Sequence, residues 1–324
     1  MTNYKKKLIV GTRSSRLALA QTNLFIEKLL ISYPEMSPDS VEIHPIKTSG
    51  DKNQSVRLDQ MGGKGLFAKE IEFELLEGKI DLAIHSMKDM PVDGNHELSI
   101  GCWLERYDVR DALLSNSNAL SFSNLSKNSV IGTSSIRRRS QVLHLRKDLS
   151  IKSLRGNVDT RIKKLHEKEF NAIILSVAGL QRLSLDHLIS FIFSENEILP
   201  AASQGAIGIQ IKSSNDNLKS FLSPLNHKMT EDLCKIEREV LELIKANCNS
   251  PIGVLATKEN NEINLRCEIF NHEGHKIYCN KLTDSFTDKN EIGKIMGEDI
   301  LSMLGQQQID SLDFLQNDFD YSPN

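Results

Sequence analysis

Cysteine is scarce in this sequence, and no two cysteines form a CxxC pair. The chain has five, an odd number that gives no sign of a zinc site or a disulfide framework. We therefore expect free thiols and, because no cluster of metal-ligating residues stands out, no metal. The five are Cys102, Cys234, Cys248, Cys267 and Cys279.

Long apolar runs are absent as well. The N-terminal run covers only residues 8–10 before polar residues resume, which is too short for the core of a signal peptide, and no stretch approaches a membrane span. We expect a cytoplasmic protein with no membrane attachment. The net charge of −3 and the lack of aromatic stripes likewise disfavour binding to nucleic acid.

Charge is uneven along the chain despite its small net value. Residues 130–166 contain ten Lys or Arg against two Asp, whereas the last sixteen residues contain four Asp and no basic residue. A local basic excess in a nearly neutral protein favours a focused anion site over a surface that coats nucleic acid. We interpret residues 311–324 as a loosely attached acidic tail.

Strands and helices alternate through the first two thirds of the chain. Residues 7–30 predict a strand, a turn at Gly11 and a helix capped by Ser14 or Ser15. A second strand near 41–49, a helix ended by Gly78 and a buried strand follow. Residues 128–179 repeat this order, and VIGTSSIRR echoes LIVGTRSSR. The pattern predicts two similarly built α/β lobes with mainly parallel sheets.

The last third has a different character. Residues 230–247 predict an amphipathic helix with Thr230 as its N-cap, and residues 263–270 and 275–282 predict two strands joined through NHEG. A final helix is expected near 288–304. These elements favour a small α+β domain with an antiparallel sheet. Before it, residues 198–212 predict a strand that returns the chain to the first lobe.

We therefore predict four parts. The first lobe comprises residues 4–104 and 204–223, and the second lobe comprises residues 105–203. The C-terminal α+β domain covers residues 228–310, and the acidic tail covers residues 311–324. A chain of 324 residues is long enough for two or three domains.

Basic residues gather where predicted strands end and helices begin. Backbone N–H groups at helix starts favour anions, and arginine binds carboxylate or phosphate through two hydrogen bonds. Such positions are unusual for arginine, because basic side chains complement the other end of a helix. The pattern predicts a large polyanionic ligand. The residues concerned are Arg137, Arg138, Arg139, Arg155, Arg161 and Arg182.

A buried strand also opens onto a Lys-Asp pair in a turn, at Lys88 and Asp89 in HSMKDMP. Asp89, Arg13 and Arg137 all lie just past predicted strands, where ligand sites of α/β folds are found. The loop MGGKGLF, residues 61–67, is not a phosphate-binding loop, because Leu58 stands where its first glycine should be and Gly65 follows Lys64. It is interpreted as a mobile lid loop bearing Lys64.

One cysteine differs from the others by position. Cys248 lies in KANCNSPIG, a predicted loop between a long helix and a proline, and is the best candidate for a reactive thiol. Cys234, Cys267 and Cys279 fall in a helix and two strands, and we interpret them as packing residues.

Together these segments resemble the porphobilinogen deaminase (hydroxymethylbilane synthase) family. The resemblance runs from about residue 8 to residue 305, and the number of ordered segments makes it specific. It implies periplasmic-binding-protein-like lobes. The segments are GTRSSRLALAQ, GGKGLFAKEIE, DLAIHSMKDMPV, ERYDVRDALLS, GTSSIRRRSQ, LRGNVDTRIKKL, AIILSVAGLQRL, LPAASQGAIGI and NCNSPIG.

The resemblance implies a transferase that joins four porphobilinogen molecules head to tail with loss of ammonia and then releases hydroxymethylbilane by hydrolysis, in haem biosynthesis. It implies a dipyrromethane cofactor attached through Cys248 and a catalytic Asp89. It implies a monomer that passes its product to the next enzyme of the pathway. Carboxylate and hydroxyl contacts would come from Arg13, Ser15, Lys88, Ser135, Arg137, Arg138, Arg155, Arg161 and Arg182.

These roles suit the chemistry of such a substrate. Loss of ammonia from an aminomethylpyrrole leaves a cation, which a carboxylate aimed at the pyrrole N–H stabilises. Each ring carries an acetate and a propionate, so a growing chain needs several basic residues. The sequence departs from the family at Ala246 and Asn247, where two glycines usually precede the cofactor cysteine, and at Ser203, which replaces a glycine.

Two other functions stay open. A two-lobed carboxylate-binding protein would share the fold without the chemistry, although the presence of both Asp89 and Cys248 and the missing export signal oppose it. A degenerate paralogue would keep the fold and lose turnover, although every expected charged site is present.

Overall fold

The structure is a computed structural model that describes residues 7–48, 68–116, 121–246, 250–271, 273–286 and 291–312. The chain forms two compact units. Unit 1 comprises Met1–Tyr107 and Gly205–Asp232, and unit 2 comprises Asp108–Gln204 and Leu233–Asn324. No helix in the described part of the chain combines the length and the apolar character needed to span a bilayer.

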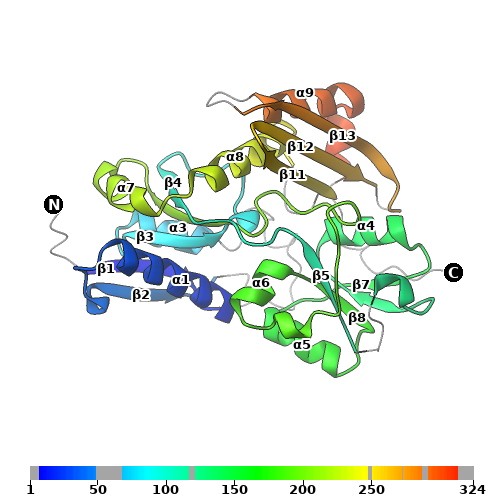
Figure 1. Ribbon diagram of the computed structural model, residues 1–324, viewed down its shortest axis with the longest axis horizontal. Coiled ribbons are helices and arrows are strands. Elements are labelled where there is room, and N and C mark those ends of the chain that lie inside the picture. The colour runs from blue at the N-terminus through cyan, green and yellow to red at the C-terminus, as the bar shows by residue number, and fades with distance from the viewer. Residues whose placement is uncertain are drawn as a thin grey trace. The chain divides into compact units, whose positions relative to one another are not determined.

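Unit 1 is built on a five-stranded sheet in the order β2-β1-β3-β10-β4. Figure 1 labels its strands β1, β2, β3 and β4. Because side chains alternate across a strand, one face buries Leu82 and Ile84 with helices α1 and α7, and the other buries Ala83 with α3. The strands are β1 (Leu8–Arg13), β2 (Val41–Ile46), β3 (Leu82–Ser86), β4 (Leu98–Trp103) and β10 (Ile207–Lys212). The helices are α1 (Arg16–Ser32), α3 (Lys69–Leu76) and α7 (Asp216–Leu222).

Unit 2 contains a second sheet with the equivalent arrangement, in the order β7-β6-β8-β5-β9. Its apolar side chains form one cluster beside α4 and another beside α5 and α6. The strands are β5 (Asp111–Ser115), β6 (Val130–Gly132), β7 (Ser150–Lys152), β8 (Ala172–Ser176) and β9 (Phe191–Ile192). The helices are α4 (Ile136–Leu145), α5 (Val158–His166) and α6 (Val177–Arg182).

The repeat seen in the sequence is a repeat in structure. In both sheets the second strand in the order, β1 or β6, leads into a helix capped by serine. Ser15 caps α1 and Ser135 caps α4, and each accepts a hydrogen bond from a backbone N–H three residues on. Two similar α/β lobes are thereby confirmed. Their sheets are mixed rather than mainly parallel, because β10 runs antiparallel to β3 and β4, and β5 runs antiparallel to β8 and β9.

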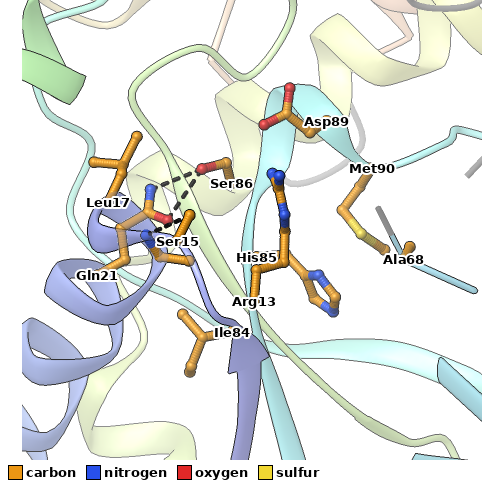
Figure 2. Close-up of a pocket in the computed structure, with 11 residues that line it drawn as sticks. Arg13, Ser15, Leu17, Gln21, Ala68, Ile84, His85, Ser86, Asp89 and Met90 are labelled. Atoms are coloured by element: carbon orange, nitrogen blue, oxygen red, sulfur yellow. Dashed lines mark hydrogen bonds between the residues drawn. The ribbon is translucent and has the colours of Figure 1, made fainter. Parts of the chain in front are cut away.

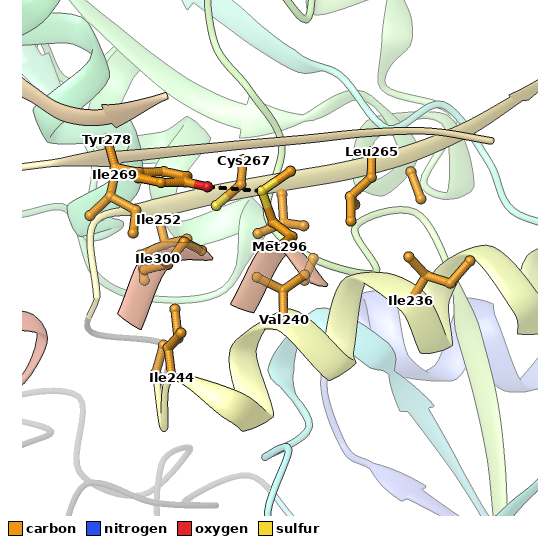
Figure 3. Packing of buried hydrophobic residues seen from close by; sticks show 14 of the residues in the cluster. Ile236, Val240, Ile244, Ile252, Leu265, Cys267, Ile269, Tyr278, Met296 and Ile300 are labelled. Carbon is orange, nitrogen blue, oxygen red and sulfur yellow. Dashed lines mark hydrogen bonds between the residues drawn. The ribbon is translucent and has the colours of Figure 1, made fainter. Parts of the chain in front are cut away.

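A three-stranded antiparallel sheet, β11-β12-β13, completes unit 2. Val240 and Ile236 of α8 pack with Met296 and Ile300 of α9 against this sheet (Figure 3). The antiparallel α+β character predicted for this segment is confirmed. The elements are α8 (Lys228–Leu243), β11 (Ile252–Glu259), β12 (Glu262–Phe270), β13 (Lys276–Ser285), α9 (Ile292–Leu304) and α10 (Gln306–Asp310).

Two local predictions in this region are wrong. Thr230 does not cap α8, which begins at Lys228; its Oγ1 instead accepts a hydrogen bond from the Arg106 backbone at 3.0 Å. Cys279 is exposed rather than packed, because it lies on the outer side of β13 and donates to Glu268 at 3.9 Å. Cys234 and Cys267 are buried, as predicted.

Candidate active site

Asp89 ends a short 3-10 turn, η3 (Met87–Asp89), that directly follows β3. Met87 anchors this turn, because its side chain is buried and its N–H donates to the Ala206 carbonyl at 3.1 Å. A Cβ added at Gly208 would lie 2.1 Å from the Met87 sulfur, so any larger residue there would have to displace the Met87 side chain. With Met87 fixed, the turn presents an exposed Asp89 and a half-buried Lys88.

A pocket in unit 1 brings Asp89 together with predicted partners. Arg13 at the end of β1 and Ser15 at the start of α1 both line it. Figure 2 shows the Arg13 side chain pointing toward the Asp89 carboxylate, although Arg13 ends β1 and Asp89 lies in the turn that follows β3. The other lining residues are Leu17, Ala18, Gln21, Ala68, Ile84, His85, Ser86 and Met90.

Three polar residues of this pocket were missed by sequence analysis. The Gln21 amide exchanges two hydrogen bonds with the Ser86 hydroxyl, at 2.7 and 3.1 Å, and so ties α1 to the end of β3 (Figure 2). His85, on β3, lines the same pocket as Arg13, which ends β1. The sequence does contain a signal for them. Gln21 falls within a helix, and His85 and Ser86 fall within a buried strand; a buried polar residue needs a hydrogen-bond partner.

His85 is a buried, neutral imidazole. Burial lowers its pKa to about 4; the hydrogen bond to Gln210 and the nearby Asp89 oppose this shift, whereas Arg13 adds to it. The ring therefore carries no charge near pH 7. Asp89 and Arg13 are the charged side chains that line the pocket with it.

Unit 2 holds the other predicted basic residues, at the carboxyl ends of parallel strands. Ser135, Arg137 and Arg138 follow β6, Arg155 follows β7, and β6 runs parallel to both β7 and β8. Arg182 follows β8 but lies at the last residue of the short helix α6, not directly at a strand end. Since parallel strands end at one edge of a sheet, these residues share that edge.

Arg137 and Arg138 are buried and share one carboxylate. Their Nη2 atoms lie 2.7 and 2.6 Å from the two oxygens of Asp111, which also accepts from Gln204 at 2.9 Å. Burial alone raises the pKa of Asp111, but the two guanidinium groups outweigh it and hold the pKa well below its usual range. Sequence analysis did not foresee this internal partner.

This arrangement still has capacity for an anion. Two guanidinium groups and one carboxylate carry a net charge of +1, and the Nε atoms of Arg137 and Arg138 are buried with no hydrogen-bond acceptor among the described residues. A buried donor without an acceptor costs roughly 1–3 kcal/mol. An anionic ligand would supply both the missing charge and the missing acceptors.

Arg155 and Arg161 flank a glycine turn. Gly156 has φ +113° and Arg161 Nε donates to its carbonyl at 2.8 Å, while Asn157 caps α5 by accepting from Thr160. Both arginines are half-buried. The turn therefore fixes the backbone between two predicted carboxylate-binding residues.

Cys248 and Lys64 lie outside the described residues, as does most of the predicted acidic tail, from residue 313 onward. Among the described cysteines, burial raises the pKa of the Cys102 thiol to about 12 and also raises that of Cys267. Neither is a thiolate near neutral pH. No group of three or more His, Cys, Asp or Glu side chains within the described ranges is arranged to hold a metal ion.

Comparisons with known proteins agree on one family. Residues 8–220 match the family model "Porphobilinogen deaminase, dipyromethane cofactor binding domain", and residues 232–302 match "Porphobilinogen deaminase, C-terminal domain". The porphobilinogen deaminase of Natranaerobius thermophilus is 40% identical over 92% of this chain and 95% of its own. The chloroplastic porphobilinogen deaminase of Pisum sativum is 41% identical over 91% of this chain and 81% of its own.

Among solved structures, a periplasmic binding protein from Salmonella typhimurium matches with a TM-score of 0.39 and 14% identity, over 70% of this chain and 94% of that chain. The cofactor named by the first family model fits the residues described above. A dipyrromethane carries acetate and propionate groups, which are the acceptors that the Arg137–Asp111–Arg138 cluster lacks. On these matches, which cover most of its length, the chain belongs to the porphobilinogen deaminase family.

Proposed function

We propose that this chain condenses four porphobilinogen molecules head to tail, releasing one ammonia at each step, and then hydrolyses the product free as hydroxymethylbilane. Membership of the family supports the reaction. The observation that carries the proposal for the site is the pocket that joins an exposed Asp89 with Arg13 and Ser15.

Asp89 is the proposed catalytic residue. The C–N bond of the substrate aminomethyl group breaks, ammonia leaves with the bonding electron pair, and the pyrrole is left as a cation. A carboxylate that accepts the pyrrole N–H lowers the energy of that cation as it forms. The ring carbon at the end of the growing chain then attacks, and its proton must be removed to restore the aromatic ring. Asp89 lies on a turn that the buried Met87 anchors, and this keeps the position of the carboxylate fixed.

The basic residues are proposed to bind the acetate and propionate groups. Lys88 and Arg13 serve this purpose in unit 1, and Arg155, Arg161 and Arg182 serve it in unit 2. Arg137 and Arg138 contribute their remaining N–H donors while staying bound to Asp111. Ser15 and Ser135 cap helices through their hydroxyl oxygens, and each hydroxyl keeps its proton to donate to a ligand carboxylate.

A bound dipyrromethane supplies a free pyrrole carbon to which the first substrate is joined. We propose that Cys248 carries it through a thioether, and that Lys64 belongs to a lid loop. Ala246 and Asn247 precede Cys248 where the family usually has glycines, and Ser203 replaces another. Ser203 adopts φ +59° and its backbone N–H is bound by Glu237 at 2.6 Å, so the backbone tolerates serine with help from that carboxylate.

We further propose that the protein is a cytoplasmic monomer that passes its product to the next enzyme of the pathway. We also propose that the chain is divided as predicted from the sequence, into two lobes, a C-terminal domain and an acidic tail. Size-exclusion chromatography with light scattering would test the monomer, and a dimer mass would contradict it.

The first experiment is the denatured intact mass of freshly purified protein, with peptide mapping of any adduct. A mass excess of two deaminated porphobilinogen units on the peptide containing Cys248 supports cofactor and function together. An unmodified chain should gain that adduct on incubation with porphobilinogen. A carboxylate-binding protein without activity would bind the substrate and remain unmodified. Finding the adduct on another cysteine would refute Cys248.

Substitution of Asp89 tests its role. The Asp89→Asn variant should fold and carry the adduct, yet lose most turnover, roughly 100-fold or more, because the amide offers no negative charge to the cation. Turnover of porphobilinogen and intact mass are measured on the same preparation. A near-normal rate would remove Asp89 from the mechanism.

A further inference from the structure

Behind the pocket, three polar side chains form a continuous chain of hydrogen bonds. His85 Nε2 lies 2.9 Å from Gln210 Oε1, and Gln210 Nε2 donates to Glu72 Oε1 at 2.8 Å. The three come from β3, β10 and α3. His85 and Gln210 lie on the same face of neighbouring strands, because His85 is opposite Gly208, two residues before Gln210.

This chain fixes which ring nitrogen of His85 carries the proton. A carboxylate oxygen accepts, so Gln210 must turn its NH₂ group toward Glu72. Its carbonyl oxygen then faces His85 and requires an N–H donor at Nε2. A neutral imidazole has only one N–H, so Nδ1 holds a lone pair and can accept a hydrogen bond.

His85 also lines the pocket that contains Arg13 and Asp89 (Figure 2). Since Gln210 occupies Nε2, Nδ1 is the ring nitrogen that remains for a ligand in the pocket. Buried histidines often serve only to satisfy neighbouring polar groups. Here the fixed tautomer leaves an acceptor nitrogen on a ring that lines the same pocket as Asp89.

We propose that Nδ1 of His85 accepts a hydrogen bond from the ammonium group of bound porphobilinogen and positions it for departure, with Gln210 and Glu72 holding the required tautomer. The inference rests on the proposed function and assigns to His85 a role at the leaving group, distinct from that of Asp89 at the pyrrole N–H.

The chemistry of the leaving group explains why a weak base suits this place. The substrate nitrogen must leave as ammonia, so it must still carry its third proton when the C–N bond breaks. With a pKa of about 4, His85 cannot remove a proton from an ammonium group, whose pKa is near 10. It orients the group without deprotonating it, and it adds no positive charge next to the cation that forms.

Two variants separate this role from a structural one. In His85→Asn the side-chain amide lies near the former Nδ1 and can keep the acceptor in the pocket, whereas in His85→Gln the amide reaches the former Nε2 and can keep the contact to Gln210. His85→Gln should lower kcat/KM roughly ten- to a hundredfold, the effect of losing one hydrogen bond to a charged group. His85→Asn should keep most of the wild-type kcat/KM.

The tautomer can be observed without substrate. The ¹⁵N spectrum of the histidine rings in the full-length, cofactor-loaded protein should show His85 protonated at Nε2 and not at Nδ1, unchanged between pH 6 and pH 8. The signal is assigned by its loss in His85→Asn. Glu72→Gln should mix the two tautomers, because the new amide can donate as well as accept. Glu74→Gln on the same helix, whose carboxylate pairs with His44, is the matched control: the His44 signal can change, whereas the His85 signal should stay as it is in the wild-type protein.

The possible outcomes are distinct. A His85 signal protonated at Nδ1, or a charged ring near neutral pH, would overturn the proposal. So would a His85→Asn variant that is less active than His85→Gln while the wild-type protein turns over porphobilinogen. A wild-type protein that never consumes porphobilinogen would instead overturn the proposed function, and the substrate role of His85 with it.

Discussion

Asp111 is one buried carboxylate that pairs with two buried guanidinium groups. Arg137 and Arg138 each also donate to a main-chain carbonyl, at Leu199 and Ile174. The cluster therefore joins the start of α4 to β5, β8 and the segment that follows β9. Removing the negative charge would leave two buried cations facing each other.

We expect Asp111→Asn to lower the free energy of unfolding by about 3–5 kcal/mol, the usual effect of removing one partner from a buried ion pair. Thermal unfolding should show a large fall in Tm, or no soluble protein. Asp108→Asn, which breaks a partly exposed pair with Arg110 at 2.6 Å, is the control and should have a much smaller effect. Equal effects from the two variants would mean that the cluster is not buried as described.

The pKa shifts of two buried groups, His85 and Asp111, predict that stability falls in separate acidic pH ranges. The pKa of His85 is lowered in the folded state, so between pH 6.5 and about 4 the unfolded chain binds the extra proton and stability falls as pH falls. Up to about 3 kcal/mol is involved over that range. Asp111 has a depressed pKa, so its contribution is lost only below about pH 4, as pH falls toward the folded pKa.

Urea unfolding at pH 7 and pH 4.5 would measure the histidine contribution. The loss between these two values should be smaller in His85→Gln than in the wild-type chain, because glutamine does not titrate. A His96→Gln variant, at an exposed histidine of unit 1, provides the comparison. An unchanged loss in His85→Gln would show that the imidazole is not held neutral in the folded protein.

Sequence analysis could name candidate residues that follow strand ends, but it could not identify the partners of buried polar residues. Asp89, Arg13 and Ser15 follow strand ends and do share a pocket. Asp111, His85 and Gln210 lie inside strands, and their polar partners are distant in sequence. Periodicity identifies a buried face, but it carries no information about which buried polar groups meet across the sheet.

At the scale of elements, the glycine turn before α5 controls two predicted ligand-binding arginines. Gly156 has φ +113°, which side chains rarely adopt, and an added Cβ would lie 2.7 Å from Thr160 Cγ2. The clash falls on the residue that shares the N-cap hydrogen bonds of Asn157. Any larger residue must therefore move the turn or disturb the start of the helix.

We expect Gly156→Ala to lower stability by about 1–3 kcal/mol through backbone strain and to raise the KM for porphobilinogen, since Arg155 and Arg161 would shift with the turn. Steady-state kinetics and thermal unfolding measure the two effects. Gly94→Ala is the matched control, because φ at Gly94 is not in the left-handed region and nothing lies within 4 Å of its added Cβ. A normal KM in Gly156→Ala would separate these arginines from substrate binding.

Element types were predictable where periodicity was long, and strand direction was not. The helices α1, α3 and α4 and the strands β1, β3 and β8 follow the predicted pattern. The antiparallel β10 was predicted only as a strand, without a direction, because alternation of side chains is the same in both directions; β5 was not predicted as a strand. The direction of a strand depends on its neighbours in the sheet. For β10 these neighbours are β3 and β4, between which the chain inserts it when it returns to unit 1.

At the scale of the whole molecule, the chain passes between the two units three times, near residues 107, 204 and 232. Within unit 2, Glu237 of α8 is fully buried and connects two of its parts. Its Oε2 accepts from Ser203 N–H at 2.6 Å and its Oε1 accepts from Ala256 N–H at 2.9 Å. The segment before β10 is thereby tied to both α8 and β11, and Val254 adds a hydrogen bond to Pro200 at 3.0 Å.

Glu237→Gln keeps the shape of the side chain but replaces one acceptor with a donor that faces a backbone N–H. We expect a loss of about 2–4 kcal/mol, because a buried N–H is left without an acceptor next to a misplaced donor. Limited proteolysis should cut faster near residues 200–206, where the tie to Ser203 is lost. Glu242→Gln, an exposed position on the same helix, should change neither stability nor cleavage. If Glu237→Gln resisted protease as well as Glu242→Gln does, the crossing segment would be held by Val254 and its apolar neighbours alone, and Ser203 could keep φ +59° without the carboxylate.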